Sequence, residues 1–135
     1  MHADQGRLLR TTFTVNALAT GATGLGFLAA GHLLGPVFGL APAVLWVLGA
    51  GFVAFAVHLA AVLRGPSITR GQALYFALAD SVYVAASVVA VMDFPHLMSG
   101  IGRLVFAGLA DVVAVFAIAE FVGWRRLSAP RPATA

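Results

Sequence analysis

One carboxylate, Asp80, lies near the middle of an apolar stretch from Gly71 to Met92 that is long enough to cross a bilayer as a helix. With a rise of about 1.5 Å per residue, Asp80 lies roughly 13 Å from the start of that helix, close to the bilayer midplane. An acid at this depth costs about 2.5 kcal/mol or more on insertion scales, so it normally faces the protein interior and has a partner. Tyr83 and Ser87 fall on the same helical face. This face is a candidate proton or cation site.

Polar side chains in two other apolar stretches match Asp80 in depth. Asn16 lies about 12 Å from the inner end of the first stretch, and Thr20 follows one turn later on the same face. Asp111, in the last stretch, lies only a few ångströms further out. We therefore predict that Asn16 contacts Asp80 in an intramembrane ion site, with Tyr83, Asp111 and Thr20 as further partners.

The charge balance of this site limits its chemistry. No arginine lies deep in any apolar stretch, and His58 is the only cation that could approach. Two mid-membrane carboxyls without a basic partner cannot both stay ionised at low cost, so they should be protonated, hydrogen-bonded or holding a cation. The structural alternative is a neutral Asp80 that bonds Asn16 and Thr20 and fixes the register of the helices.

A further carboxylate, Glu120, lies near the inner end of the last stretch. It is about half a turn around the helix from Asp111, so the two should serve different neighbours. We expect Glu120 to contact an inner arginine, His58 at similar depth, or another subunit.

A second candidate group lies on the outer side, where His32 follows the first stretch and Asp93, His96 and Met98 follow the third. Two imidazoles with a carboxylate or thioether could bind a transition metal, and two imidazoles could ligate a haem. No HxxxH or HExxH spacing supports such a site, so histidines in the membrane interface are the simpler interpretation. We therefore expect no cofactor, and keep a metal or haem at His32, Asp93 and His96 as an alternative.

Enzymatic activity is not expected. The chain contains no nucleophile elbow and no zinc-protease helix, and its loops are too short to build a conventional active site. It also contains no cysteine, which excludes disulfides, thiolate nucleophiles and iron–sulfur sites.

Four apolar stretches must position these side chains, with expected bounds of 8–30, 42–63, 71–92 and 103–123. Pro42 suits the first turn of the second span, and Thr69 with Gln72 forms a capping box before the third. Residues 32–41 contain two glycines and a proline and are predicted to be a connector, and residues 128–135 a disordered tail. Connectors this short predict an all-α polytopic membrane protein, a four-transmembrane-helix bundle with up-down-up-down topology.

The composition supports a membrane protein with one domain, residues 1–127. Of the 135 residues, 61% are hydrophobic and only 10% are charged, against about 25% charged in a soluble domain. A net charge of +3 could suggest nucleic acid, but the arginines cluster at the ends of the apolar stretches. We therefore expect the lipid bilayer, and not nucleic acid, as a partner. Seven arginines fall on one side of the membrane and only Arg103 on the other, which predicts that both termini are cytoplasmic.

Small and hydroxyl side chains recur every four residues along the first span, at Thr12, Asn16, Thr20 and Gly24. Such a face lets a neighbouring backbone approach, and Ala50 with Ala54 is a weaker signal of the same kind in the second span. We therefore expect a non-enzymatic subunit that acts by packing, as a homo-oligomer or with other membrane subunits. One alternative is a small proton- or cation-coupled transporter or channel that uses Asp80. Another is a haem- or metal-binding membrane subunit.

The layout as a whole combines a basic start, an Asn/Thr/Gly-rich first span, an acid in the third span and an acid before a final Trp-Arg-Arg. It resembles small uncharacterised four-span inner-membrane proteins of GC-rich bacteria. The likeness covers nearly the whole chain and rests on architecture. It implies a multi-pass protein of the bacterial cytoplasmic membrane and assigns no functional residue.

Overall fold

The computed structural model describes the backbone of residues 2–127 and the side chains of residues 6–127. This part consists almost entirely of four helices, α1 (His2–Phe38), α2 (Pro42–Leu63), α3 (Arg70–Asp93) and α4 (Gly100–Leu127), with a short 3-10 turn, η1 (Pro95–Leu97), before α4. All four helices are long and apolar enough to cross a membrane. The predicted all-α class and four spans are thereby confirmed, and the architecture is that of a multi-pass integral membrane protein. The tail predicted at residues 128–135 lies outside the described residues.

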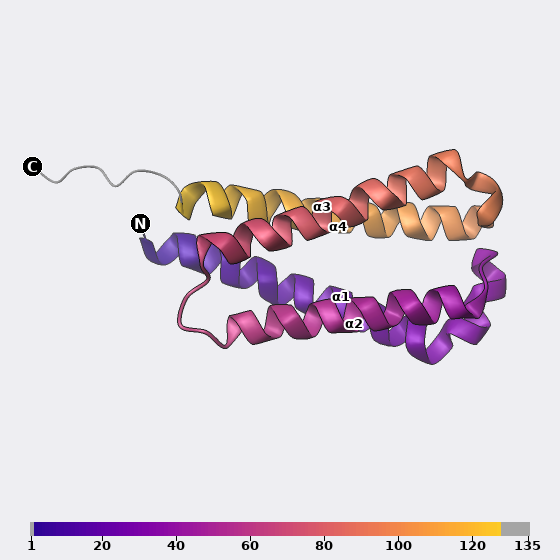
Figure 1. Ribbon diagram of the computed structural model, residues 1–135, viewed down its shortest axis with the longest axis horizontal. Helices are drawn as coiled ribbons and strands as arrows, with labels where there is room; N and C mark the ends of the chain where they lie inside the picture. The colour runs from indigo at the N-terminus through magenta and orange to yellow at the C-terminus, as the bar shows by residue number, and fades with distance from the viewer. Residues whose placement is uncertain (1, 128–135) are drawn as a thin grey trace, which may run out of the picture.

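The helices form two antiparallel hairpins, α1–α2 and α3–α4, that pack against each other (Figure 1). α1 packs closely on α2 and α4, and α4 packs closely on α3. α2 and α3 meet mainly through aromatic rings: the centroids of Phe52 and Tyr83 are 5.3 Å apart, and those of Phe55 and Phe76 are 5.4 Å apart. The two hairpins therefore approach each other most closely between α1 and α4, and are held apart by rings between α2 and α3.

α1 extends well into the connector predicted at residues 32–41, so that prediction is wrong over most of its length. Pro36 removes one backbone donor, but one lost hydrogen bond does not end this helix. The helix ends instead at Gly39, whose φ of 71° is a conformation that glycine adopts readily. There Gly39 N–H donates to the Pro36 carbonyl at 3.3 Å and Leu40 N–H to the Gly35 carbonyl at 2.9 Å. These are the two bonds of a Schellman motif.

The facing ends of α2 and α3 are both capped. At α3 the predicted capping box is confirmed, because Gln72 N–H donates to Thr69 Oγ1 at 3.2 Å and Thr69 N–H donates to Gln72 Oε1 at 2.8 Å. At α2 the guanidinium of Arg10 donates to the carbonyls of Leu63 and Gly65, each at 3.0 Å. Arg10 belongs to α1, so it ties the C-terminal end of α2 to the neighbouring helix.

α1 and α2 touch backbone to backbone where Gly24 faces Gly49. A Cβ atom on Gly24 would lie 2.8 Å from the Gly49 carbonyl oxygen, and a Cβ on Gly49 would lie 2.8 Å from the Gly24 carbonyl oxygen. The predicted small-residue face of the first span therefore does bring a neighbouring backbone close. Ala50 and Ala54 are both exposed, and within the chain it is Gly49 that makes the contact.

We expect Gly24→Ala to lower the free energy of unfolding by about 1–3 kcal/mol, because the added methyl would press on the backbone of α2. The matched control is Gly26→Ala on the same helix, where a Cβ meets nothing within 4 Å. That variant should be neutral or slightly stabilising, since alanine favours the helix over glycine. Unfolding in mixed detergent micelles would measure both. Equal stability of the two variants would show that α1 and α2 can move apart without loss.

Candidate functional site

Three polar side chains from three helices meet inside the bundle. Asn16 of α1 and Glu120 of α4 are 0% exposed, and Asp80 of α3 is 5% exposed. Asn16 Nδ2 donates to Asp80 Oδ2 at 2.7 Å and to Glu120 Oε1 at 3.1 Å. The contact predicted between Asn16 and Asp80 is thus confirmed. Asp80 and Glu120, the carboxyl pair, each accept one of the two hydrogens of a single carboxamide group.

Helical spacing on α1 holds the Asn16 side chain in this orientation. Thr20, one turn later, donates its hydroxyl to Asn16 Oδ1 at 2.8 Å. With its oxygen engaged by Thr20, the carboxamide directs its NH2 group at the two carboxyls, the assignment that this hydrogen-bond network requires. Thr12, one turn earlier, is also buried. The line of polar residues predicted on the first span therefore points at α3 and α4.

No basic side chain among residues 6–127 pairs with the carboxyl pair. His58, the cation expected to approach, instead packs against the rings of Tyr75 and Phe76, with centroids 5.4 and 5.0 Å away. Glu120 Oε2 is buried and has no hydrogen-bond partner in this part of the chain. Two carboxyls that share a donor and lack a cation cannot both be ionised at low cost. At least one of them therefore holds a proton when no cation is bound.

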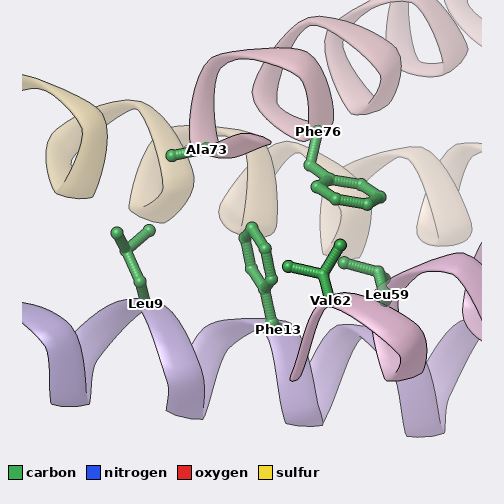
Figure 2. Close-up of a cluster of buried hydrophobic side chains, with 6 residues drawn as sticks. All are labelled: Leu9, Phe13, Leu59, Val62, Ala73 and Phe76. Carbon is green, nitrogen blue, oxygen red and sulfur yellow. The ribbon is translucent and has the colours of Figure 1, made fainter. Parts of the chain in front are cut away.

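An apolar plug fills the bundle on one side of the carboxyl pair, and its side chains are drawn in Figure 2. It consists of buried side chains from α1, α2 and α3: Leu9, Phe13, Leu59, Val62, Ala73 and Phe76. Phe13 and Phe76 meet edge to face, with ring centroids 5.0 Å apart. They come about one helical turn before Asn16 and Asp80 respectively. The plug therefore separates the carboxyl pair from the end of the bundle where α1 begins.

A chamber of about 200 Å³ lies on the other side of Asp80, among all four helices. Its polar lining comes from Asp80, Thr20 and Thr23. The rest is apolar and includes three aromatic rings, Phe52, Phe55 and Phe116. The chamber reaches the surface at Gly51 and Val112, which line it and are exposed. Asp80 is therefore covered by apolar packing toward the end where α1 begins, and adjoins a space that opens midway along α2 and α4.

Tyr83, predicted as a partner of Asp80, lies beside the chamber without a bond to that residue. Its hydroxyl is buried and has no hydrogen-bond partner among the described residues. The Ser87 hydroxyl faces it from one turn further along α3, but not in the geometry of a hydrogen bond. Because the hydroxyl oxygen of Tyr83 has almost no accessible surface, this residue presents its ring, and not its hydroxyl, to the chamber.

The two carboxyls of α4 have exchanged the positions that we predicted for them. Glu120 joins Asp80, whereas Asp111, predicted as the partner, is exposed on the outer face of the bundle. About two and a half helical turns separate them, so only one can face the interior. Depth estimated from span ends favoured Asp111 because the last span was expected to end at residue 123. α4 in fact runs to Leu127, so Glu120 lies deeper than expected.

One signal in the sequence could have identified Glu120. The packed face of α4 is marked by small residues, and buried Ala110, Ala117 and Gly123 lie on it at helical spacing. Glu120 falls three residues after Ala117 and three before Gly123, on that same face. The expectation that it would contact an arginine or His58 is therefore corrected by its bond to Asn16.

The outer candidate ligands do not form a cluster. His32, Asp93 and His96 are all exposed. No group of three His, Cys, Asp or Glu side chains within the described residues could hold a metal ion. The ring of His96 lies against Phe94, with centroids 6.3 Å apart, and Met98 packs into an apolar cluster near the end of α1.

No protein-family model matches this chain, and no curated protein or solved structure is significantly similar to it. The four spans agree with the architecture of small four-span membrane proteins. A bacterial origin stays a prediction. The geometry of the bundle is therefore the basis for a functional proposal.

Proposed function

We propose that this protein is a non-enzymatic, proton-coupled membrane transporter in which the carboxyl pair binds and releases the coupling proton. The observation that carries the proposal is that Asp80 and Glu120 share one amide group from Asn16, with no basic partner in the described part of the chain. Such a pair can hold a proton or exchange it for a cation. Buried carboxyls of this kind mark proton relays and ion pathways in membrane proteins.

The carboxyl pair is shielded toward both ends of the bundle. The plug blocks the end where α1 begins, and a second cluster of buried rings, with Phe27, Phe38 and Phe106, fills the opposite end beyond the chamber. Seven of the eight arginines lie toward the plugged end by sequence. By the positive-inside rule, we place that end and both termini in the cytoplasm, with the protein in a bacterial inner membrane.

A pH jump on protein reconstituted into solid-supported membranes tests the proposal without knowledge of a substrate. A proton that enters a buried site crosses part of the membrane field, so its binding displaces charge that an electrode records. We expect a transient current from the native chain and at least a tenfold smaller one from the double variant Asp80→Asn/Glu120→Gln. Both replacements keep an oxygen that accepts from Asn16, so the bundle should stay folded.

The matched control for this experiment is Asp93→Asn. It also removes a carboxyl, but from the end of α3 next to the outer loop, where a proton binds without crossing the membrane interior. Its current should equal that of the native chain. A current that survives in the folded double variant, or that is absent from the native chain, would refute the proton role of the pair.

A second function, assembly into a homo-oligomer, is favoured by the position of Asp111. This exposed residue lies near the middle of α4, beside a hollow of about 220 Å³ that it shares with buried Ser87 of α3. A carboxyl in lipid at this depth costs about 2.5–3.5 kcal/mol, so it should face protein. A neutral carboxyl carries both a donor and an acceptor, so two copies of Asp111 can pair across a two-fold axis. We therefore propose a second copy of the chain as the partner on this face.

A further inference from the structure

We propose that the chamber beside Asp80 binds a small monovalent organic cation with apolar substituents, which exchanges with the proton of the carboxyl pair. This inference rests on the proposed transport function and names the class of molecule that would be moved. It is carried by the size of the chamber, by the hydrogen-bonding state of its polar lining and by its aromatic walls.

The size of the chamber limits the occupant. About 200 Å³ equals the liquid volume of about seven water molecules and exceeds the roughly 150 Å³ of an engineered cavity that binds benzene. It is smaller than the roughly 300–1,000 Å³ of pockets for drug-sized ligands. A bare metal ion fits poorly, because hard cations require six or more oxygen ligands and most of this lining is carbon. The chamber therefore suits a compact organic molecule.

The polar lining consists mainly of hydrogen-bond acceptors. Thr20 already donates its hydroxyl to Asn16 Oδ1 at 2.8 Å, and Thr23 donates its hydroxyl to the Ala19 carbonyl at 2.9 Å. Both oxygens can therefore offer only lone pairs to the chamber. Asp80 receives the Asn16 bond on Oδ2, so its Oδ1 is a further acceptor once the carboxyl has released its proton. Such a lining repels an anion and attracts a cation.

The aromatic rings that line the chamber also favour a positively charged ligand. Phe52, Phe55, Phe116 and Tyr83 line the chamber, and the rings of Phe52 and Tyr83 meet edge to face with centroids 5.3 Å apart. Aromatic faces attract cations, and cages of such rings recognise quaternary ammonium groups. Alkyl substituents on the ligand would replace the hydration shell that this apolar lining cannot provide. A carboxylate with aromatic walls therefore matches an alkylated ammonium ion.

Entry of the cation would displace a proton. The O–H bond of the neutral carboxyl breaks, its proton passes to water, and the resulting carboxylate pairs with the cation without forming a covalent bond. The net charge of the site is unchanged, so the buried carboxylate never lacks a counter-charge. Because one proton leaves for each cation bound, affinity should fall about tenfold for each unit by which pH is lowered while the site is protonated.

Calorimetric titration of the native chain in lipid nanodiscs with tetramethylammonium chloride tests this inference. Comparing buffers of different ionisation enthalpy gives the number of protons released. We expect saturable binding with release of up to one proton per cation, and at least a tenfold loss of affinity in Asp80→Asn. tert-Butanol, a neutral molecule of similar size, should release no proton.

A substitution that fills the chamber tests cation binding without changing either residue of the carboxyl pair. Gly51 lines the chamber, and a Cβ there would meet nothing within 4 Å, so Gly51→Leu should fill space without moving the backbone. It should weaken tetramethylammonium binding at least tenfold. The matched control is Gly108→Leu on α4, where a Cβ also meets nothing within 4 Å outside the chamber lining. That variant should bind like the native chain.

These measurements test the cation site in the chamber and the proton role of the carboxyl pair separately. Binding without proton release, or binding unchanged by Gly51→Leu, would overturn the assignment of the chamber. A native chain that gives the pH-jump current but does not bind tetramethylammonium would also overturn it, and would leave proton coupling by the carboxyl pair intact. Absence of both signals would overturn the inference and the proposed function together.

Discussion

Asn16→Leu should be the most damaging single substitution in the bundle, lowering the free energy of unfolding by about 2–5 kcal/mol. Leucine is apolar and similar in size, so the loss would come from hydrogen bonding and not from packing. Asp80 and Glu120 would both lose their donor, and each unsatisfied buried acceptor costs about 1–3 kcal/mol. Thr20 would also lose its acceptor. Titration with a denaturing detergent in mixed micelles would measure the change.

Two further variants show whether the carboxyls are the cause. Thr14→Leu, on the exposed face of α1, removes a hydroxyl that bonds only within its own helix, to the Arg10 carbonyl, and should change stability by less than about 0.5 kcal/mol. Combining Asn16→Leu with Asp80→Leu and Glu120→Leu should recover much of the loss, since a buried polar set replaced as a whole is often nearly neutral. If Asn16→Leu is as stable as Thr14→Leu, the shared hydrogen bonds contribute nothing to the fold.

Asp111→Leu should convert a dimer of this chain into monomers. A symmetric pair of neutral carboxyls makes two interhelical hydrogen bonds, each worth about 0.6–2 kcal/mol in a membrane. Their loss should weaken association about tenfold or more, because every 1.4 kcal/mol is a factor of ten. Native mass spectrometry of protein purified gently from its own membranes would measure the distribution of species.

The matched control for the dimer is Asp111→Asn. A carboxamide also donates and accepts, so this variant should keep the dimer. A native chain that is monomeric and carries only lipid would refute self-association, as would a dimer that survives Asp111→Leu. A heavier species that contains other polypeptides would show that the Asp111 face binds a different subunit.

Much of the architecture and half of the carboxyl pair could be predicted from the sequence. The four spans follow from apolar runs longer than about 20 residues, a requirement that the bilayer imposes on each helix separately. The capping box of Thr69 and Gln72 depends only on neighbours three residues apart, and it was predicted correctly. The contact between Asn16 and Asp80 followed from depth, because helical rise places both near the midplane.

The inward position of Glu120 depends on the rotation of α4 about its own axis, which the depth of a residue in the membrane does not determine. Which face of α4 turns inward is decided by tertiary packing, where Gly123 accommodates the side chain of Leu9 and Gly102 approaches the Phe38 carbonyl. Those contacts turn Glu120 inward and Asp111 outward. The chamber was not predicted for a similar reason, since its walls come from four helices whose mutual rotation the sequence does not state. Its role as an ion site stays a prediction.

Two contacts between neighbouring helices differ in how tightly they are packed: the α1–α2 contact is made by backbone, and the α2–α3 contact by aromatic rings. Between α1 and α2, Gly24 and Gly49 bring the backbones so close that a Cβ atom on either residue would collide with the facing helix. Between α2 and α3, the contact is made by rings that meet edge to face, and rings can pivot about their side-chain bonds while staying in contact. Relative motion of the helices would therefore occur mainly at the α2–α3 contact, with the α1–α2 hairpin moving as a rigid body. Phe52, Phe55 and Tyr83 of the α2–α3 contact also line the chamber, so the same motion would widen or narrow the opening of the chamber.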